Sequence, residues 1–422
     1  MIKKIDKKNK FISMFNPKTG FYIRTGIIDE TGKDTGIDPF MSYMPELVDI
    51  GIMGKCLHGE SGLCVKSGIE CYQDGLNTKK DNMTLDNFKK IINQLKGHSF
   101  QVALGGRGDV NKHEKFEEFV KYSRENNIIP NYTTSGLGLT IDEVRITRDN
   151  CGAVAVSEYR SEYTRKAIRM FVESGVKTNI HFVLGNNTID DAINKLLNNG
   201  FDKGINAVIF LMHKPIGLGS QENVLKVNDE RVKKFFNLID NNKYDFKIGF
   251  DSCSCSGIIN FTSKINKDSM DFCEGGRYSA YIDAQMNMMP CSFGNQDSKL
   301  FIDLNKFTVQ EAWNSIIFEK FRDSLKYSCS KCIDRDSCGG GCPIVNEITL
   351  CKRKEREFYG KVRTDFVTNS SSSSFICLKC NESIECYDWD DDYERNMCNY
   401  CYDQLSEEDQ EKVKLGKYIS NN

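Results

Sequence analysis

The chain has 422 residues, of which 57 are basic and 59 acidic, and its formal net charge is −2. A nearly neutral chain produces no strong field for nucleic acid or for an anionic membrane surface, so neither partner is expected. No apolar run reaches the roughly 18 to 20 residues of a membrane-spanning helix. The basic segment 1–20 lacks the apolar core of a signal peptide. We therefore expect a cytoplasmic protein, long enough for two or three domains.

The sequence contains 18 cysteines, which in a reducing compartment indicate metal binding or catalysis rather than disulfides. Only Cys56, Cys64, Cys71 and Cys151 precede residue 250. Cys151 stands alone at the start of a predicted strand, as a small core residue would. The uneven distribution predicts a catalytic domain followed by extensions that bind metal.

Short apolar runs and longer amphipathic stretches alternate between residues 47 and 250. The predicted strands are 46–54, 99–106, 128–136, 151–157, 177–185, 206–212 and 245–251. The predicted helices are 84–97, 112–127, 162–175 and 188–200. Six or seven repeats of a strand followed by a helix predict a parallel α/β barrel, complete or partial. In such barrels the active site lies at the carboxyl ends of the strands.

Three cysteines follow the first predicted strand directly. Seven residues separate Cys56 from Cys64, and six separate Cys64 from Cys71. Three thiolates leave one coordination position vacant, as catalytic metal sites do. Free buried thiols and an incomplete zinc site are the alternatives. His58 is either a competing ligand or, as we expect, an exposed histidine of the loop.

A second set of cysteines has short, regular spacing, with two residues between Cys329 and Cys332, five more before Cys338, and three before Cys342. Cys351 follows this array, and two cysteines precede it, Cys273 and Cys291. With the three-cysteine loop that ends in "CYQ", this order resembles the radical S-adenosylmethionine (SAM) enzymes that carry a SPASM-type extension. The resemblance covers roughly residues 45–355 and implies a partial TIM-like (β/α)6 barrel, an α/β fold.

The resemblance implies that Cys56, Cys64 and Cys71 bind a 4Fe–4S cluster whose fourth iron chelates SAM. Electron transfer from that cluster then cleaves SAM and yields a 5′-deoxyadenosyl radical, which abstracts a hydrogen atom from the substrate. The loop departs from the family's spacing of three and two intervening residues. Its glycines permit the tight turns that closure on one cluster requires. Met286 also stands where the SPASM pattern usually has glycine.

The resemblance also implies where SAM binds. Gly105 and Gly106 match the family's Gly-Gly-Glu motif, although Arg107 replaces the acidic residue. By position in the family pattern, Thr134, Ser157 and Glu158 lie in the region that binds the ribose of SAM. Arg165 or Arg169 would meet the SAM carboxylate, since arginine suits bidentate binding of carboxylates. For either arginine a solvated charge on a helix is the alternative.

Two auxiliary 4Fe–4S clusters are implied by the SPASM-like region. The inner one would be bound by Cys273, Cys291 and Cys342, with Cys253 as fourth ligand and Cys255 spare; alternatively, one iron stays open for substrate. The outer one has four implied ligands: Cys329, Cys332, Cys338 and Cys351.

The C-terminal segment has zinc-ribbon spacing, because Cys377 and Cys380 form one knuckle and Cys398 and Cys401 a second. Cys386 is left over. The serine-rich stretch before the first knuckle is either a flexible linker or part of a small substrate-like protein fused to the enzyme. We therefore expect an N-terminal extension, a radical SAM barrel, a SPASM-like domain, a linker and a zinc-ribbon-like module, at residues 1–46, 47–250, 251–355, 356–376 and 377–422.

The resemblance implies a maturase that modifies a ribosomally made peptide or protein and takes electrons from a flavodoxin or ferredoxin. The C-terminal segment of the chain itself is one candidate substrate. An alternative enzyme oxidises a Cys or Ser residue, as anaerobic sulfatase maturases do. The competing class is a non-catalytic iron–sulfur or zinc module for redox sensing or protein binding.

Overall fold

The computed structural model describes residues 1–58, 62, 66, 68, 70–266, 269–329, 331–352, 372–376 and 383–387. The chain divides into two compact units, Met1–Lys352 and Arg353–Asn422. In the described part of the second unit, β14 (Ser372–Ile376) pairs antiparallel with β15 (Ser383–Tyr387). The serine-rich stretch expected to be a flexible linker thus ends in a strand, because the ladder with β15 pairs its backbone groups.

A ten-stranded sheet organises the first unit, in the order β10-β9-β8-β7-β6-β5-β4-β11-β12-β13. All neighbours from β10 to β11 are parallel, and β12 and β13 add antiparallel strands at the edge. The strands are β4 (Leu47–Met53), β5 (Gln101–Gly106), β6 (Ile129–Thr134), β7 (Val154–Ser157), β8 (Thr178–Leu184), β9 (Ala207–Met212), β10 (Lys247–Phe250), β11 (Ser279–Ile282), β12 (Asn287–Met289) and β13 (Ile302–Asp303).

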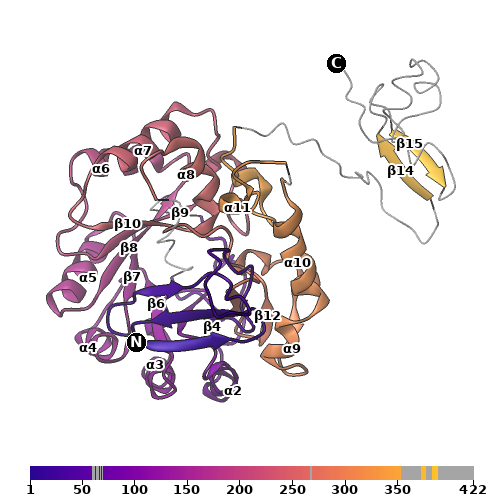
Figure 1. The fold of residues 1–422 in the computed structure, drawn as a ribbon. Coiled ribbons are helices and arrows are strands. Elements are labelled where there is room, and N and C mark those ends of the chain that lie inside the picture. Colours follow the sequence, from indigo (N-terminus) through magenta and orange to yellow (C-terminus); the bar gives the residue numbers. More distant parts are fainter. Residues whose placement is uncertain are drawn as a thin grey trace. The chain divides into compact units, whose positions relative to one another are not determined.

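Helices α2 to α7 follow β4 to β9 in turn and form an arc along the outside of the parallel strands (Figure 1). Their bounds are α2 (Leu85–Leu95), α3 (Phe116–Glu125), α4 (Ile141–Asn150), α5 (Glu162–Glu173), α6 (Ile189–Leu197) and α7 (Glu230–Asn241). These six strand–helix units confirm the predicted α/β fold with a partial barrel. The sequence prediction did not single out α4 and α7.

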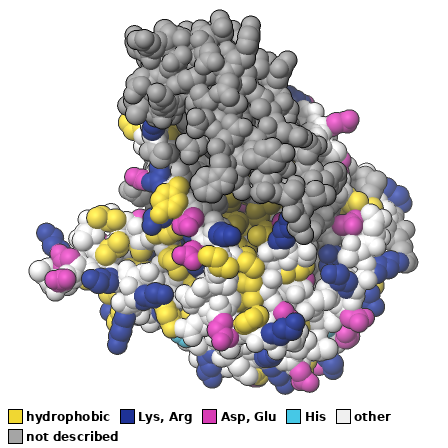
Figure 2. All heavy atoms as spheres, turned by 90° about the vertical axis from the view of Figure 1, so that its right-hand side faces the viewer, with side chains coloured by type: hydrophobic (Ala, Val, Ile, Leu, Met, Phe, Trp, Pro, Cys, Tyr) yellow, Lys and Arg dark blue, Asp and Glu magenta, His cyan; other side chains and the backbone are white. Residues whose placement is uncertain are grey.

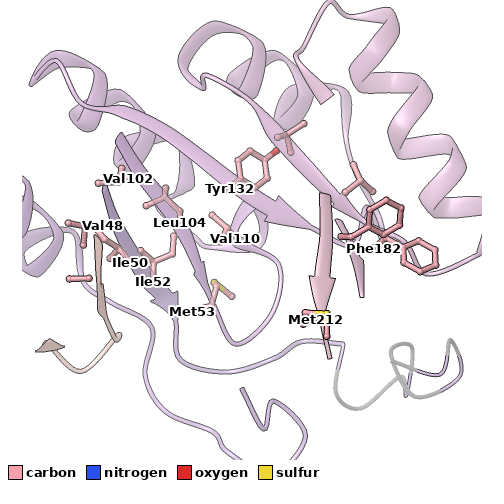
Figure 3. Close-up of a cluster of buried hydrophobic side chains, with 14 of the residues drawn as sticks. Val48, Ile50, Ile52, Met53, Val102, Leu104, Val110, Tyr132, Phe182 and Met212 are labelled. Carbon is pink, nitrogen blue, oxygen red and sulfur yellow. The ribbon is translucent and has the colours of Figure 1, made fainter. Parts of the chain in front are cut away.

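The core between the sheet and these helices is built from one apolar face of each helix and from alternate residues of the strands. In α2 the buried residues are Phe88, Ile91, Ile92 and Leu95, which is the spacing of one helix face. In β4, every second residue is buried among apolar side chains: Val48, Ile50 and Ile52 (Figure 3). Because side chains of a strand alternate between its two faces, Asp49 and Gly51 face the opposite side, the inside of the barrel.

An N-terminal antiparallel sheet covers the amino ends of the barrel strands. It consists of β1 (Ile2–Asp6), β2 (Phe11–Phe15) and β3 (Tyr22–Arg24), in that order. Phe15 forms a small core with Phe100, which precedes β5, and Ile129, which begins β6. The amino ends are therefore occupied, and the carboxyl ends are left for a functional site.

The cysteine-rich region continues the same unit. Its helices are α8 (Cys255–Phe261), α9 (Val309–Trp313), α10 (Ile316–Tyr327) and α11 (Arg335–Cys338). Because β11 pairs with β4 in parallel, this region shares the main sheet. The fully buried Trp313 also donates a hydrogen bond from Nε1 to the Ser42 carbonyl, at 3.1 Å.

On the described part of the face in Figure 2, basic and acidic side chains are interspersed, as a net charge of −2 leads one to expect. Within the residues that the structure describes, no helix has the length and apolar character needed to cross a membrane.

Candidate functional site

Two of the three predicted cluster ligands lie together just beyond the carboxyl end of β4. A Cβ atom placed on Gly75 would lie 3.7 Å from Sγ of Cys56 and 3.6 Å from Sγ of Cys71. A Cβ on Gly108 would lie 3.6 Å from Sγ of Cys56. Because neither glycine has a side chain, a space remains next to the two thiols. Cys64 lies outside the described residues.

Neighbouring loops hold this cysteine segment. Arg107 is buried and donates from Nε to the carbonyl of Gln73, at 3.0 Å. The loop after β9 also reaches the segment, because the amide of Leu218 donates to the carbonyl of Cys71, at 3.0 Å. The arginine that replaces the family's acidic residue thus binds the chain two residues after Cys71.

The prediction of an exposed His58 is wrong, because this histidine is 8% exposed and pairs with Asp109. Its Nε2 atom lies 3.0 Å from Oδ2 of Asp109. Asp109 also accepts hydrogen bonds from the amide and hydroxyl of Ser135, at 2.7 and 2.6 Å. A buried carboxylate with three donors holds the histidine in the interior.

Three predicted SAM residues lie at the carboxyl ends of β5 and β6. Gly105 is open, since a Cβ there would meet no atom within 4 Å. Gly106 has a φ of +111°, and a Cβ on it would lie 2.5 Å from the carbonyl oxygen of Met53. Only glycine fits that close approach between β5 and β4. Thr134 is buried, and its Oγ1 accepts from the amide of Gly136 at 3.0 Å.

The other predicted SAM residues follow β7. Ser157 ends this strand opposite His181, and Glu158 is buried beyond it. Arg165 pairs with both Glu158 and Asp202, so its guanidinium group has two carboxylate partners. Oε2 of Glu158 is buried and has no hydrogen-bond partner within the described structure. A buried carboxylate oxygen without a donor fits a ligand that supplies a hydroxyl group.

An open hollow of about 550 Å³ lies between the cysteine loop and the segment after β7. Its described lining residues are Lys66, Gly68, Tyr159, Arg160, Ser161, Tyr163 and Asn187. Nδ2 of Asn187 donates to the carbonyl of Gly68 at 2.8 Å, which ties the loop to the carboxyl end of β8. The hollow therefore adjoins both the predicted cluster loop and the predicted ribose site.

Four thiols of the predicted inner cluster site lie close to one another. The Cys253 thiol is hydrogen-bonded to the Cys342 thiol, and this contact, followed by burial, raises the pKa of Cys253 well above its usual value. Burial raises the pKa of Cys291, and the nearby thiols of Cys273 and Cys253 add to the rise. The neighbouring Cys255 instead donates from Sγ to the carbonyl of Asp271, at 3.1 Å.

The predicted outer ligands form a separate group. Burial raises the pKa of Cys338, with smaller contributions in the same direction from Cys351, Cys329 and Cys332. A Cβ on Gly340 would lie 3.6 Å from Sγ of Cys329. These four thiols are therefore neighbours, as one shared cluster requires.

Among the described residues, no three His, Cys, Asp or Glu side chains converge closely enough to hold a single metal ion. In a 4Fe–4S cluster each thiolate binds a different iron atom, so its ligands need not converge on one point. Both four-thiol groups fit such a cluster by their donor chemistry. Cys377, Cys380, Cys398 and Cys401 lie outside the described residues, and the zinc site stays a prediction.

The sequence prediction missed polar residues inside and at the rim of the barrel. Lys214 follows β9 and Asp251 follows β10, and the buried lysine pairs there with the partly buried aspartate. Asp49 faces the barrel interior, and burial raises its pKa to about 6. Their positions on or just after predicted strands were the available signal, because barrels place functional residues at strand ends.

Comparisons with known proteins bear on this arrangement. A profile of the SPASM family, an iron–sulfur cluster-binding domain, matches residues 273–333. No curated protein sequence matches the chain.

Solved structures share the fold at low sequence identity. Streptococcus suis SuiB bound to S-adenosylmethionine is 13% identical over 74% of this chain and 78% of its own, with a TM-score of 0.57. SuiB bound to its precursor peptide SuiA is 13% identical over 74% and 77%, with a TM-score of 0.56. The protein anSMEcpe with AdoMet and Cp18Cys peptide is 17% identical over 72% and 91%, with a TM-score of 0.54.

The SPASM match and the shared fold confirm the predicted resemblance. The chain has the fold of radical SAM enzymes that carry a SPASM domain.

Proposed function

We propose that the chain is a radical SAM maturase that modifies a ribosomally made peptide or small protein. One observation carries this proposal: Cys56 and Cys71 lie together beyond the carboxyl end of the first barrel strand, with two further thiol groups in the SPASM region. A chain that only senses redox state or binds zinc would not need a cysteine loop at the catalytic end of a barrel.

Each predicted residue has a role in this proposal. Cys56, Cys64 and Cys71 hold a cluster that, when bound with SAM, supplies the electron for SAM cleavage and thus the radical. The backbone carbonyls of Gly105 and Gly106 would accept hydrogen bonds from the methionyl amine. The ribose hydroxyls lie near Thr134, Ser157 and Glu158, and the unpartnered Oε2 atom of Glu158 supports a hydroxyl donor at that place. Arg165 pairs with Glu158 and would be the partner of the SAM carboxylate in this proposal.

The proposed substrate class is a peptide. Structures of two proteins with the same fold contain peptides, SuiA in SuiB and the Cp18Cys peptide in anSMEcpe, which supports this choice. The C-terminal segment of the chain itself is a candidate substrate, with zinc bound by its four knuckle cysteines. A flavodoxin or ferredoxin would deliver the electron.

A second candidate reaction is oxidation of a Cys or Ser residue in a target protein, as in an anaerobic sulfatase maturase. The likeness to anSMEcpe with its Cp18Cys peptide favours this alternative. Tandem mass spectrometry of cysteine- and serine-containing peptides after turnover separates this oxidation from formation of a crosslink. Both reactions remove two hydrogens, but only a crosslink joins two residues and changes the fragmentation between them.

Anaerobic reconstitution followed by SAM turnover tests the proposal. With three clusters, we expect about twelve irons per chain and formation of 5′-deoxyadenosine under dithionite. The triple variant of Cys56, Cys64 and Cys71 to Ala should lose about four irons and all turnover. Cys151→Ala, which removes a buried core thiol, is the matched control and should retain both. Equal turnover by the triple variant would reject these cysteines as ligands.

A further inference from the structure

A buried lysine lies beside the proposed inner cluster site. Lys214 is 7% exposed, and its ammonium group pairs with Asp251, which follows the neighbouring strand. Oδ2 of Asp251 also accepts a hydrogen bond from the amide of Met212 at 3.1 Å, and Oδ1 accepts one from Oγ of Ser254 at 2.8 Å. The two hydrogen bonds from Met212 and Ser254 hold the Asp251 carboxylate in place. The carboxylate in turn holds the ammonium group of Lys214.

The ammonium group of Lys214 lies next to the segments that carry two predicted ligands of the inner cluster. Its ion-pair partner Asp251 is two positions before Cys253. The ring of Phe293, over which its Nζ atom lies, is two positions after Cys291. Burial lowers the pKa of Lys214, but the charge of Asp251 opposes burial, and the pKa stays above its usual value.

An aromatic contact links the lysine to the loop of the other proposed cluster. Nζ of Lys214 lies 4.5 Å from the ring centroid of Phe293. The same ring contacts Tyr72 edge-on, with centroids 5.1 Å apart, and Tyr72 follows Cys71 directly. Lys214 is thus connected through one aromatic pair to the SAM-cluster loop.

The ion pair has a consequence for any cluster bound at these thiols. Burying an ammonium group costs several kcal/mol unless it is well paired. Within the described structure, Asp251 supplies an ion pair to Lys214 and Phe293 supplies a cation–π contact, so the charge is retained beside the predicted ligands. The reduction potential of an iron–sulfur cluster depends on the charges around it. A nearby cation stabilises the reduced state, which carries one more negative charge.

We propose that Lys214, held by Asp251, raises the reduction potential of the cluster bound by Cys253, Cys273, Cys291 and Cys342. This inference rests on the proposed function, because it requires an iron–sulfur cluster at that site. In this proposal Lys214 makes no bond to the cluster and acts on it only through its positive charge.

The test is a potentiometric titration of the full, anaerobically reconstituted chain, followed by electron paramagnetic resonance. Lys214→Met should lower the equilibrium constant for one-electron reduction of the inner cluster at least tenfold, which corresponds to 59 mV. Lys214→Arg, which keeps the charge, should restore the wild-type value. Asp251→Asn should shift the potential upward, because it removes a negative charge and leaves the ammonium group. A purely structural role would not give shifts of opposite sign.

A second lysine serves as the control. Nζ of Lys4 also lies over an aromatic ring, 3.8 Å from the centroid of Phe100, and beside Glu46, but at the amino ends of the strands. Lys4→Met should leave the potential unchanged. An unaltered potential in Lys214→Met with full cluster content would overturn this inference alone. A wild-type chain that assembles no auxiliary cluster would overturn the proposed function and this inference with it.

Discussion

Nε2 of His58 lies 3.0 Å from Oδ2 of Asp109, and both side chains are buried. His58 belongs to the loop after β4, whereas Asp109 belongs to the loop after β5. Ser135, which follows β6, donates two further hydrogen bonds to the same carboxylate. One aspartate thus joins the loops at the carboxyl ends of three adjacent strands, and one of these loops carries Cys56.

Replacing Asp109 by alanine should destabilise the fold. The change removes the acceptor of three buried hydrogen bonds, and each such loss costs about 1–3 kcal/mol. We expect the free energy of unfolding to fall by about 2–4 kcal/mol in total, because the three donors relax together. Urea denaturation measures it. Asp149→Ala, on a side chain that is 47% exposed, is the control and should change stability by less than about 0.5 kcal/mol. Equal effects of both substitutions would contradict the role of Asp109.

Gly75→Ala should weaken the cluster site without unfolding the protein. The added methyl group would lie 3.1 Å from Cβ of Cys56, so that side chain must give way, and it would occupy space in contact with Sγ of Cys71, at 3.6 Å. We expect reconstituted iron to fall from about twelve to about eight atoms per chain, with the circular dichroism spectrum unchanged.

Gly105→Ala is the matched variant for Gly75→Ala. A Cβ at position 105 meets no atom within 4 Å, so iron content should be retained. If SAM binds beside this glycine as proposed, the methyl group should weaken SAM binding, which equilibrium dialysis measures. Iron loss in both variants, or in neither, would show that contact with the thiols does not determine cluster binding.

Much of the barrel follows from the sequence, because its strands are short apolar runs whose neighbours have helical periodicity. Helix α4 was missed since only Val144 and Thr147 are buried on it. Its start is fixed instead by a capping box between Thr140 and Glu143, a local signal that apolar periodicity does not contain.

The site was less predictable, because it is assembled from residues that are distant in sequence. The family resemblance implies which thiols would share a cluster, but His58 in a glycine-rich loop gives no sign that Asp109 will bury it. The partner of Lys214 directly follows the next strand, 37 positions away, and the parallel register of β9 and β10 brings it close.

Asp49→Asn should stabilise the protein at high pH and have no effect at low pH. Burial raises the pKa of Asp49 from 3.8 to about 6, so the folded state holds a proton that the unfolded state has already released. Stability from this group is therefore greatest below pH 4 and is lost as the pH rises through 6. A difference of about two pH units corresponds to at most about 3 kcal/mol.

Urea denaturation of both proteins at pH 4 and pH 8 measures this effect. We expect Asp49→Asn to be more stable than the wild type by about 1–3 kcal/mol at pH 8, and the gap to close at pH 4. The control is Asp149→Asn, which should give no gap that depends on pH. A gap of the same size at both pH values would mean that ionisation of Asp49 is not its cause.

Cys253 and Cys255 are two residues apart, and the structure separates their roles. The Cys253 thiol is hydrogen-bonded to that of Cys342, whereas Cys255 donates to the carbonyl of Asp271. If Cys253 is the fourth ligand, Cys253→Ala should leave an open iron that exogenous cyanide or thiol binds, with a changed resonance signal from the inner cluster. Cys255→Ala should leave that signal unaltered, because its thiol has a backbone partner.

An unchanged inner-cluster signal in Cys253→Ala would instead mean that the cluster keeps one iron open in the wild type. Iron content and ligand-dependent resonance spectra of both variants decide between these outcomes.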